Sequence, residues 1–297
     1  MGNSIFQITG GIGKHIAATA VIENHRKSFP LEKIIVVAAW PEVFTNNSSC
    51  DRLYKIGFTP NFYQDYINES AKIFCQDPYL TQNHILKTAH LIENWTEMTG
   101  AKFNYLQMPV LKITATEEDL ALSKLPKTNK PILLFQPFGG VENATGLNYS
   151  WSRDIHPRLA QGLVDILSEK YTVVHVCYKH HPILNNCFRF DEIVNKKALF
   201  AMLKFSQEAL LIDSSLQHAA AAFDIPSTVL WNVTSPDIFG YNLHTNFTPK
   251  HQYLEGTVDS YLYDYGFNGV VHECPYSTDE LSKLWDFDEI VTPLMNQ

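Results

Sequence analysis

The sequence predicts an α/β protein with two successive units, each built around a mostly parallel sheet. The chain has 297 residues, of which 45% are hydrophobic and 18% charged, enough for two cores of ordinary size. It opens with a strand, a glycine-rich turn, a helix and a second apolar strand, the order of a Rossmann-like fold. A second alternation of strands and helices begins near residue 132. Both units are therefore expected to be Rossmann-like.

The N-terminal domain is predicted over residues 1–125. Its clearest strand is "KIIVVAA" (33–39), a β-branched run typical of a strand buried on both faces. The charged, proline-containing stretch 115–131 is the expected linker to the next domain. The other expected elements are a strand over 4–8, a helix over 14–28 and a helix over 83–100.

The C-terminal domain is predicted over residues 126–280, and a tail over 281–297 is open to packing back on the first domain. Because the strands are expected to be parallel, ligands should bind at their carboxyl ends, in a central cleft between the two domains. The expected strands cover 132–140, 171–178, 209–213 and 227–231, and the expected helices cover 157–169, 198–206, 215–223 and 276–285.

Composition excludes several classes of protein. A net charge of −8 argues against a free-standing nucleic-acid binder. No apolar run approaches the roughly 18 residues of a membrane helix, and no secretory signal opens the chain. The five cysteines are scattered without a CxxC pair, so neither disulfides nor a structural zinc site is expected. These features together predict a cytoplasmic protein without a metal site.

The glycine-rich turn "ITGGIGKH" (8–15) fits neither common nucleotide motif. Gly11 and Gly13 match the start of G-x-G-x-x-G, but Ile16 replaces the last glycine of a dinucleotide fold. A P-loop needs Ser or Thr after Lys14, where this chain has His15. Taken alone, the segment is best explained as a tight turn that needs glycine only for its backbone geometry.

The most informative stretch is "LLIDSSLQHAAAAFDIPSTVLWNVTSP" (210–236). Asp213 ends a predicted strand, and Ser214 is a suitable N-cap for the helix that follows. The backbone N–H groups and dipole at the start of this helix suit a phosphate group. His218 lies four residues after Ser214, so both fall on one helix face.

This stretch resembles the C-terminal signature of glycosyltransferase family 9, the heptosyltransferase-like enzymes. Ser215 stands where the family has glycine, and Tyr149 stands where it has a lysine. The N-terminal half is similar too, through its first turn, the "RKSFP" segment and Glu42 after the second strand. The matching residues of the signature are Asp213, Ser214, His218, Ala220 to Ala222, Pro226, Thr234 and Pro236.

The resemblance implies a GT-B fold, with the acceptor on the first domain and a nucleotide-diphospho-sugar on the second. It implies an inverting, metal-independent transfer of a hexosyl or heptosyl group to a glycan or other hydroxyl acceptor, with no cofactor besides that co-substrate. The family's general base is an aspartate of the first turn, where this chain has Lys14. The candidate catalytic residues are therefore His15, Lys14 and Glu42, and the acceptor-side turn contains Gly11 and Gly13.

The resemblance also implies a donor-binding set in the second domain. A catalytically silent nucleotide-sugar-binding protein on the same fold is the alternative, because Lys14, Tyr149 and Ser215 depart from the family pattern. The candidate donor-binding residues are Gly139, Gly140, Arg153, Tyr178, Lys179, Asp213, Ser214, Ser215 and His218.

Overall fold

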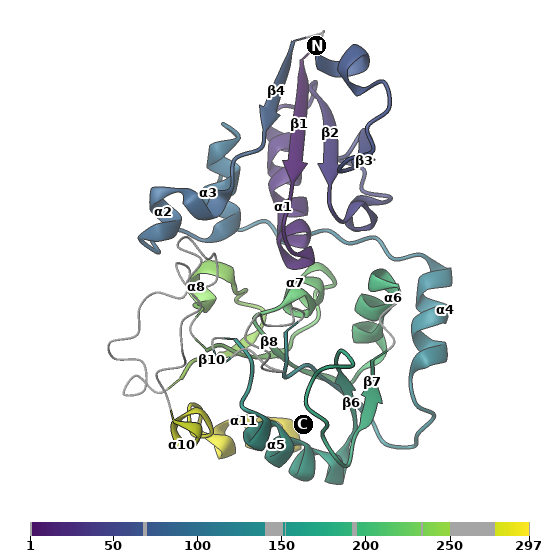
Figure 1. The fold of residues 1–297 in the computed structure, drawn as a ribbon, viewed down its shortest axis with the longest axis vertical. Coiled ribbons are helices and arrows are strands. Elements are labelled where there is room, and N and C mark those ends of the chain that lie inside the picture. The colour runs from purple at the N-terminus through teal and green to yellow at the C-terminus, as the bar shows by residue number, and fades with distance from the viewer. Residues whose placement is uncertain are drawn as a thin grey trace. The chain divides into compact units, whose positions relative to one another are not determined.

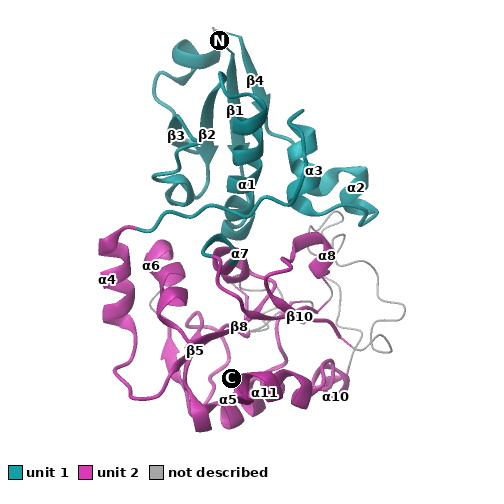
Figure 2. Cartoon of the chain, turned by 180° about the vertical axis from the view of Figure 1, so that it is seen from behind, with its two compact units in different colours: residues 1–113, 221–223 teal, residues 114–220, 224–297 magenta. Residues whose placement is uncertain are grey.

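The computed structural model divides into two compact α/β units (Figure 2). The first comprises Met1–Ile113 and Ala221–Phe223, and the second comprises Thr114–Ala220 and Asp224–Gln297. Every strand pair described within the two sheets is parallel, so the predicted fold class is confirmed. The structure describes residues 2–67, 70–139, 151, 153–191, 195–232, 234–249 and 277–296.

The first unit contains a four-stranded sheet in the order β3-β2-β1-β4. The two central strands were predicted because they are apolar and buried. The two outer strands were missed, since each has four residues and polar or half-exposed side chains. The strands are β1 (Asn3–Ile8), β2 (Lys33–Ala38), β3 (Arg52–Lys55) and β4 (Ala71–Phe74).

Helices α1 (Ile12–Ser28) and α3 (Leu91–Met98) pack together in the first unit (Figure 1). The single helix predicted over 83–100 is wrong. The chain instead forms the short α2 (Gln82–Ile85), and Lys87 then adopts a left-handed conformation, with φ 54°, that no helix continues through.

The second unit contains a six-stranded sheet in the order β10-β9-β8-β5-β6-β7. Its four inner strands coincide with the predicted ones. The two edge strands have only three residues each, too few to produce a periodic pattern. The strands are β5 (Ile132–Phe135), β6 (Thr172–Val176), β7 (Phe188–Phe190), β8 (Glu208–Ile212), β9 (Thr228–Leu230) and β10 (Thr245–Phe247).

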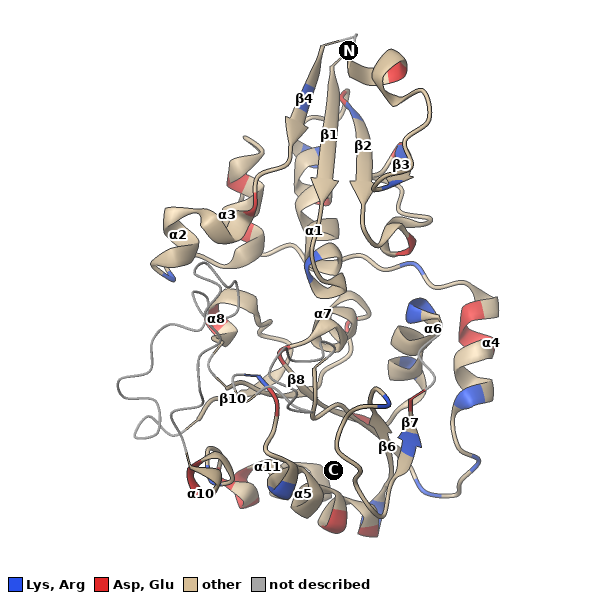
Figure 3. Ribbon diagram, in the orientation of Figure 1, with Lys and Arg blue, Asp and Glu red and all other residues tan. Residues whose placement is uncertain are grey.

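Part of the expected linker is a helix of the second unit, α4 (Ala115–Lys124). Thr114 and Glu117 form a reciprocal capping box that starts it. Its acidic first turns face the basic α6 (Lys196–Ala201), as Figure 3 shows, and Glu117 lies 3.2 Å from the Lys197 ammonium. The chain therefore divides after Ile113 rather than after residue 125.

The C-terminal tail belongs to the second unit. Helix α11 (Phe287–Asn296) packs on α5 (Pro157–Lys170), with Ile290 and Leu294 in the same core as Leu163. The Tyr171 hydroxyl donates to the Leu294 carbonyl oxygen at 2.6 Å. The tail thus contributes to the core of the second unit. The other α-helices within the described residues are α7 (Ser215–Ala222), α8 (Pro236–Phe239) and α10 (Thr278–Leu281).

Candidate functional site

The glycine-rich turn joins β1 to α1 at the carboxyl edge of the first sheet, the edge where its parallel strands end. Gly10, with φ 91°, is the residue in the left-handed region that favours glycine. Of the two predicted glycines, Gly11 is the N-cap of α1 and Gly13 lies in its first turn. Trp40 follows β2, and its indole N–H donates to the Gly10 carbonyl oxygen at 3.1 Å. The turn therefore depends on Gly10, which sequence reasoning did not select.

His15 ends the glycine-rich segment and lies in the first turn of α1. Its imidazole is fully buried, with Nδ1 2.8 Å from the Gly11 carbonyl oxygen and Nε2 3.0 Å from that of Ile8. Burial lowers the pKa of His15, although both carbonyl contacts act in the opposite direction. Through these two contacts, the ring connects the end of β1 to the start of α1.

Lys14 is buried as well, and it pairs with an aspartate that the sequence reasoning missed. Its Nζ lies 3.0 Å from Asp77 Oδ2, and the two side chains are 7% and 35% exposed. The same ammonium lies 5.0 Å from the ring centroid of Tyr79 and 5.6 Å from that of Trp95. The signal for Asp77 was its position just after β4, a strand the sequence did not reveal.

Glu42, the third catalytic candidate, lies in the single turn Pro41–Phe44 that follows β2. Its side chain is half-buried, and its charge raises the pKa of His15 slightly against the larger effect of burial. Glu42 and Asp77 thus both follow strands at the carboxyl edge.

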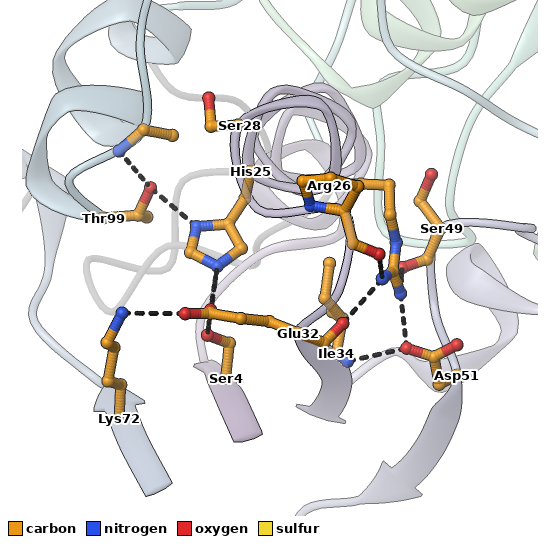
Figure 4. Close-up of polar contacts among 12 residues, drawn as sticks. Ser4, His25, Arg26, Ser28, Glu32, Ile34, Ser49, Asp51, Lys72 and Thr99 are labelled. Atoms are coloured by element: carbon orange, nitrogen blue, oxygen red, sulfur yellow. Dashed lines mark hydrogen bonds and ion pairs between the residues drawn. The ribbon is translucent and has the colours of Figure 1, made fainter. Parts of the chain in front are cut away.

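The opposite, amino edge of the same sheet contains a larger polar network, shown in Figure 4. Buried His25 Nε2 lies 3.1 Å from Glu32 Oε2, and the Lys72 ammonium donates to Glu32 Oε1 at 2.8 Å. Ser4 donates to the same carboxylate, and Arg26 pairs with Asp51. Burial alone would raise the pKa of Glu32, but the hydrogen bonds from Lys72, Ser4 and His25 lower it to about 2.

In the second unit, Gly139 follows β5 and approaches an aspartate closely. Its N–H donates to Asp154 Oδ1 at 2.7 Å. A Cβ at this position would lie 3.1 Å from the same oxygen, so a larger residue would press on the carboxylate. Gly140, the other glycine of the predicted pair, lies outside the described residues.

Two candidate donor-binding residues meet where β8 ends. Arg153 Nε lies 4.0 Å from Asp213 Oδ2, with Asp213 nearly buried and Arg153 half-exposed. Ser214 Oγ accepts from the Leu216 N–H at 3.3 Å, the capping contact expected at the start of α7, whose first residue is Ser215. The Ser214 hydroxyl also donates to Gln136, which follows β5.

His218 faces a buried polar group rather than solvent. Its Nδ1 lies 2.8 Å from the Tyr241 hydroxyl. Burial, and then the nearby Asp213 carboxylate, raise the pKa of Tyr241, so this hydroxyl keeps its proton. Gln217 donates to the Phe239 carbonyl oxygen at 3.1 Å and extends the network. Sequence reasoning selected His218 but not its partner.

Tyr178 and Lys179 form a loop after β6 that Arg189 holds in place. The Arg189 Nη2 donates to the Tyr178 carbonyl oxygen at 2.8 Å and to that of Lys179 at 3.2 Å. The Lys196 ammonium donates to the Tyr178 hydroxyl at 3.2 Å. The Lys179 side chain is exposed.

Two buried histidines, His175 in β6 and His181 in the loop after it, pack against Phe138, which follows β5. The Phe138 ring centroid lies 5.6 Å from that of His175 and 5.5 Å from that of His181. Burial, followed by nearby Arg189 and His181, lowers the pKa of His175 to about 3. Burial and neighbouring His180 lower the pKa of His181 to about 4. Both rings are therefore neutral near pH 7.

Over the described part of the chain, no three His, Cys, Asp or Glu side chains gather as metal ligands would. Within the same residues, no helix has both the length and the apolar character needed to cross a bilayer.

The fold is similar to that of solved bacterial glycosyltransferases. A glycosyl transferase family 9 protein from Veillonella parvula superposes with a TM-score of 0.66 and 14% identity, covering 99% of this chain and 97% of that one. The chain has the fold of these enzymes. The E. coli ADP-heptose lps heptosyltransferase II superposes with a TM-score of 0.66 and 11% sequence identity, covering 99% of both chains. The E. coli heptosyltransferase WaaC with ADP superposes with a TM-score of 0.57 and 11% sequence identity, also covering 99% of both chains.

The resemblance seen in the sequence is thus confirmed at the level of the GT-B fold. At 11–14% sequence identity, the chain is a distant structural relative of these enzymes. No family model matches this sequence, and no curated protein matches it.

Proposed function

We propose that this chain is an inverting, metal-independent glycosyltransferase that moves a hexosyl or heptosyl group from a nucleotide-diphospho-sugar to a glycan or other hydroxyl acceptor. The observation that supports it best is the group of side chains at the carboxyl edge of the second sheet. Arg153 and the capped start of α7 meet there beside Asp213. The fold shared with heptosyltransferases, two of which are named with ADP or ADP-heptose, supports the same class of donor.

Each group has a chemical role in this proposal. Arg153 and the backbone N–H groups at the start of α7 bind the diphosphate, because a cation and a helix N-terminus both stabilise negative charge. Asp213 accepts hydrogen bonds from sugar hydroxyls. Gly139 lets the backbone after β5 approach the diphosphate closely. Stabilising the leaving diphosphate in this way lowers the barrier to transfer.

The loop Tyr178–Lys179 contributes to nucleotide binding in this proposal, with Lys179 as its exposed cation. His218 acts through its hydrogen bond to Tyr241, which fixes the first turn of α7. The proposed location is the cytoplasm, which the free thiols of Cys50, Cys75, Cys177 and Cys187 support.

The test is a panel of nucleotide-diphospho-sugars, ADP-heptose among them, incubated with the whole protein. Release of nucleoside diphosphate and a rise in melting temperature are expected for at least one donor, with release unchanged by EDTA. Loss of release on chelation would contradict metal independence. A protein that neither binds nor turns over any donor would contradict the whole proposal.

Changing Arg153 to Gln gives the sharpest single variant. Because a hydrogen bond to a charged group contributes about 1.5–3 kcal/mol, donor affinity should fall about tenfold or more. Arg158→Gln is the matched control, since Arg158 lies in the same unit and pairs with exposed Asp279 at 3.6 Å. Equal affinity in the two variants would remove Arg153 from the donor site.

A catalytically silent nucleotide-sugar-binding protein is the second candidate. It is favoured by the burial of both Lys14 and His15 at the first turn. Saturable donor binding without any release of nucleoside diphosphate would favour this alternative.

A further inference from the structure

We propose that Asp77 is the general base that takes the proton from the acceptor hydroxyl. This inference rests on the proposed transferase function and adds a residue that the sequence motifs do not select. Asp77 follows β4 at the carboxyl edge of the first sheet. Because β4 pairs in parallel with β1, Asp77 lies at the same edge as the glycine-rich turn.

The Asp77 carboxylate is held in a defined orientation. Oδ2 accepts from the Lys14 ammonium at 3.0 Å, and Oδ1 accepts from the Tyr79 N–H at 3.2 Å. Lys14 comes from the first turn of α1, so its contact with Asp77 joins residues 63 positions apart in the chain, whereas the Tyr79 contact is local. A charge-assisted hydrogen bond of this kind fixes a carboxylate more firmly than a neutral one does.

The partner of this carboxylate is unusually enclosed. The Lys14 side chain is only 7% exposed, and its ammonium lies against the rings of Tyr79 and Trp95, 5.0 and 5.6 Å from their centroids. A buried ammonium is costly unless it is paired, so Lys14 holds Asp77 and does not itself reach an acceptor. Lys14 is therefore a positioning residue.

Asp77 remains accessible to a substrate, since 35% of its side chain is exposed. The other candidate bases are less suitable. His15 is fully buried, and both of its ring nitrogens contact carbonyl oxygens. Glu42 follows β2 at the same edge and is the competing carboxylate, so the experiment below includes it.

A carboxylate oxygen of Asp77 takes the proton of the acceptor hydroxyl, while the acceptor oxygen forms a bond to the anomeric carbon. The bond between that carbon and the diphosphate oxygen breaks, and the nucleoside diphosphate leaves with the electron pair. Asp77 later releases the proton to water.

The experiment compares wild type with Asp77→Asn in the whole protein, measuring donor binding by thermal shift and nucleoside diphosphate release with acceptor or water. Asp77→Asn should bind the donor normally. Its rate of product release should fall at least about 100-fold, because a general base contributes about that much or more. Glu42→Gln tests the competing carboxylate, and this proposal expects it to slow product release far less than Asp77→Asn does.

Two further variants separate chemistry from folding. Asp77→Asn leaves a buried ammonium unpaired, so the double variant Lys14→Met/Asp77→Asn removes both charges; it should stay folded and inactive. Asp51→Asn is the matched control, because Asp51 also pairs with a cation and is 39% exposed, but at the amino edge. It should retain turnover.

The outcomes are distinct. Wild-type turnover that survives in both Asp77 variants overturns the role of Asp77 and leaves the transferase proposal standing. Loss in Glu42→Gln instead assigns the base to Glu42. Donor binding without turnover in wild type overturns the base role and favours the silent protein. A wild type that neither binds nor turns over any donor overturns the transferase proposal and this inference with it.

Discussion

The two edges of the first sheet use the same chemistry in different ways. Each has a buried cation or imidazole facing a carboxylate, Lys14 with Asp77 at the carboxyl edge and His25 with Glu32 at the amino edge. At the amino edge, three side chains donate to or contact Glu32, which is 16% exposed. At the carboxyl edge, one side chain holds Asp77, which is 35% exposed.

This difference separates a structural network from the pair that we propose is reactive. A carboxylate that several donors surround gains stability from them and has little capacity left for a substrate. A carboxylate oriented by one ammonium and still open to solvent is able to accept a proton from a bound molecule. The amino-edge network lies at the edge where parallel sheets do not usually bind ligands, which agrees with a structural role.

The largest effect on stability is expected from Glu32→Gln. The pKa of Glu32 is about 2 in the folded protein, below its ordinary value of 4.5. At pH values above that ordinary pKa, the charged carboxylate therefore stabilises the folded protein by about 3 kcal/mol. This stabilisation is lost as the pH falls toward about 2. Glu32→Gln should lose this amount at pH 7, measured by urea denaturation, and its stability should vary less over that acidic range.

His25 adds a second acid-sensitive contribution. Burial lowers the pKa of His25, an effect that Glu32 partly offsets, so protonation below its ordinary value of 6.5 opposes folding. Both groups therefore make the first unit less stable as pH falls. An acid profile of Glu32→Gln identical to that of wild type would contradict the role assigned to the amino-edge network.

A smaller effect, on turnover rather than stability, is expected from Lys14→Met. The apolar side chain fits between Tyr79 and Trp95, so the fold should survive, but Asp77 loses its orienting partner. Turnover should fall about tenfold at unchanged donor affinity, because catalysis depends on orientation. Lys14→Arg, which keeps the cation, should recover part of it. Full activity in Lys14→Met would show that Asp77 needs no positioning.

The smallest effect is expected from Lys72→Met at the amino edge. Lys72 is 59% exposed, so its ion pair with Glu32 is largely screened by water. The free energy of unfolding should fall by about 0.5 kcal/mol, measured under the same urea conditions. A loss as large as that of Glu32→Gln would mean that Lys72, rather than His25 and Ser4, provides most of the stabilisation of this network.

Local sequence was enough to predict much of the fold. The β-branched run of β2 and the apolar β6 identify buried strands without reference to any other segment. Capping residues mark helix starts locally, as Ser277 and Glu280 do for α10 through a reciprocal capping box. Ser214 did the same for α7. Such signals are local, because the groups that interact lie within a few residues of each other.

The missed elements lack such signals. Strands β3 and β4 are short and lie at sheet edges, where half-exposed polar side chains give no clear alternation. Helix α4 was taken for a linker because its sequence is charged. Its ion pairs with Lys197 and Lys204, far along the chain, account for that charge.

The sequence by itself determined the order of strands and helices, the chemistry of the turn after β8 and the replacement of an expected aspartate by Lys14. Only the tertiary structure decided that His15 points inward and that Lys14 meets Asp77 across 63 residues. The physical reason is that pairing in a parallel sheet brings the ends of distant strands to one edge, and no local periodicity encodes which ends will meet.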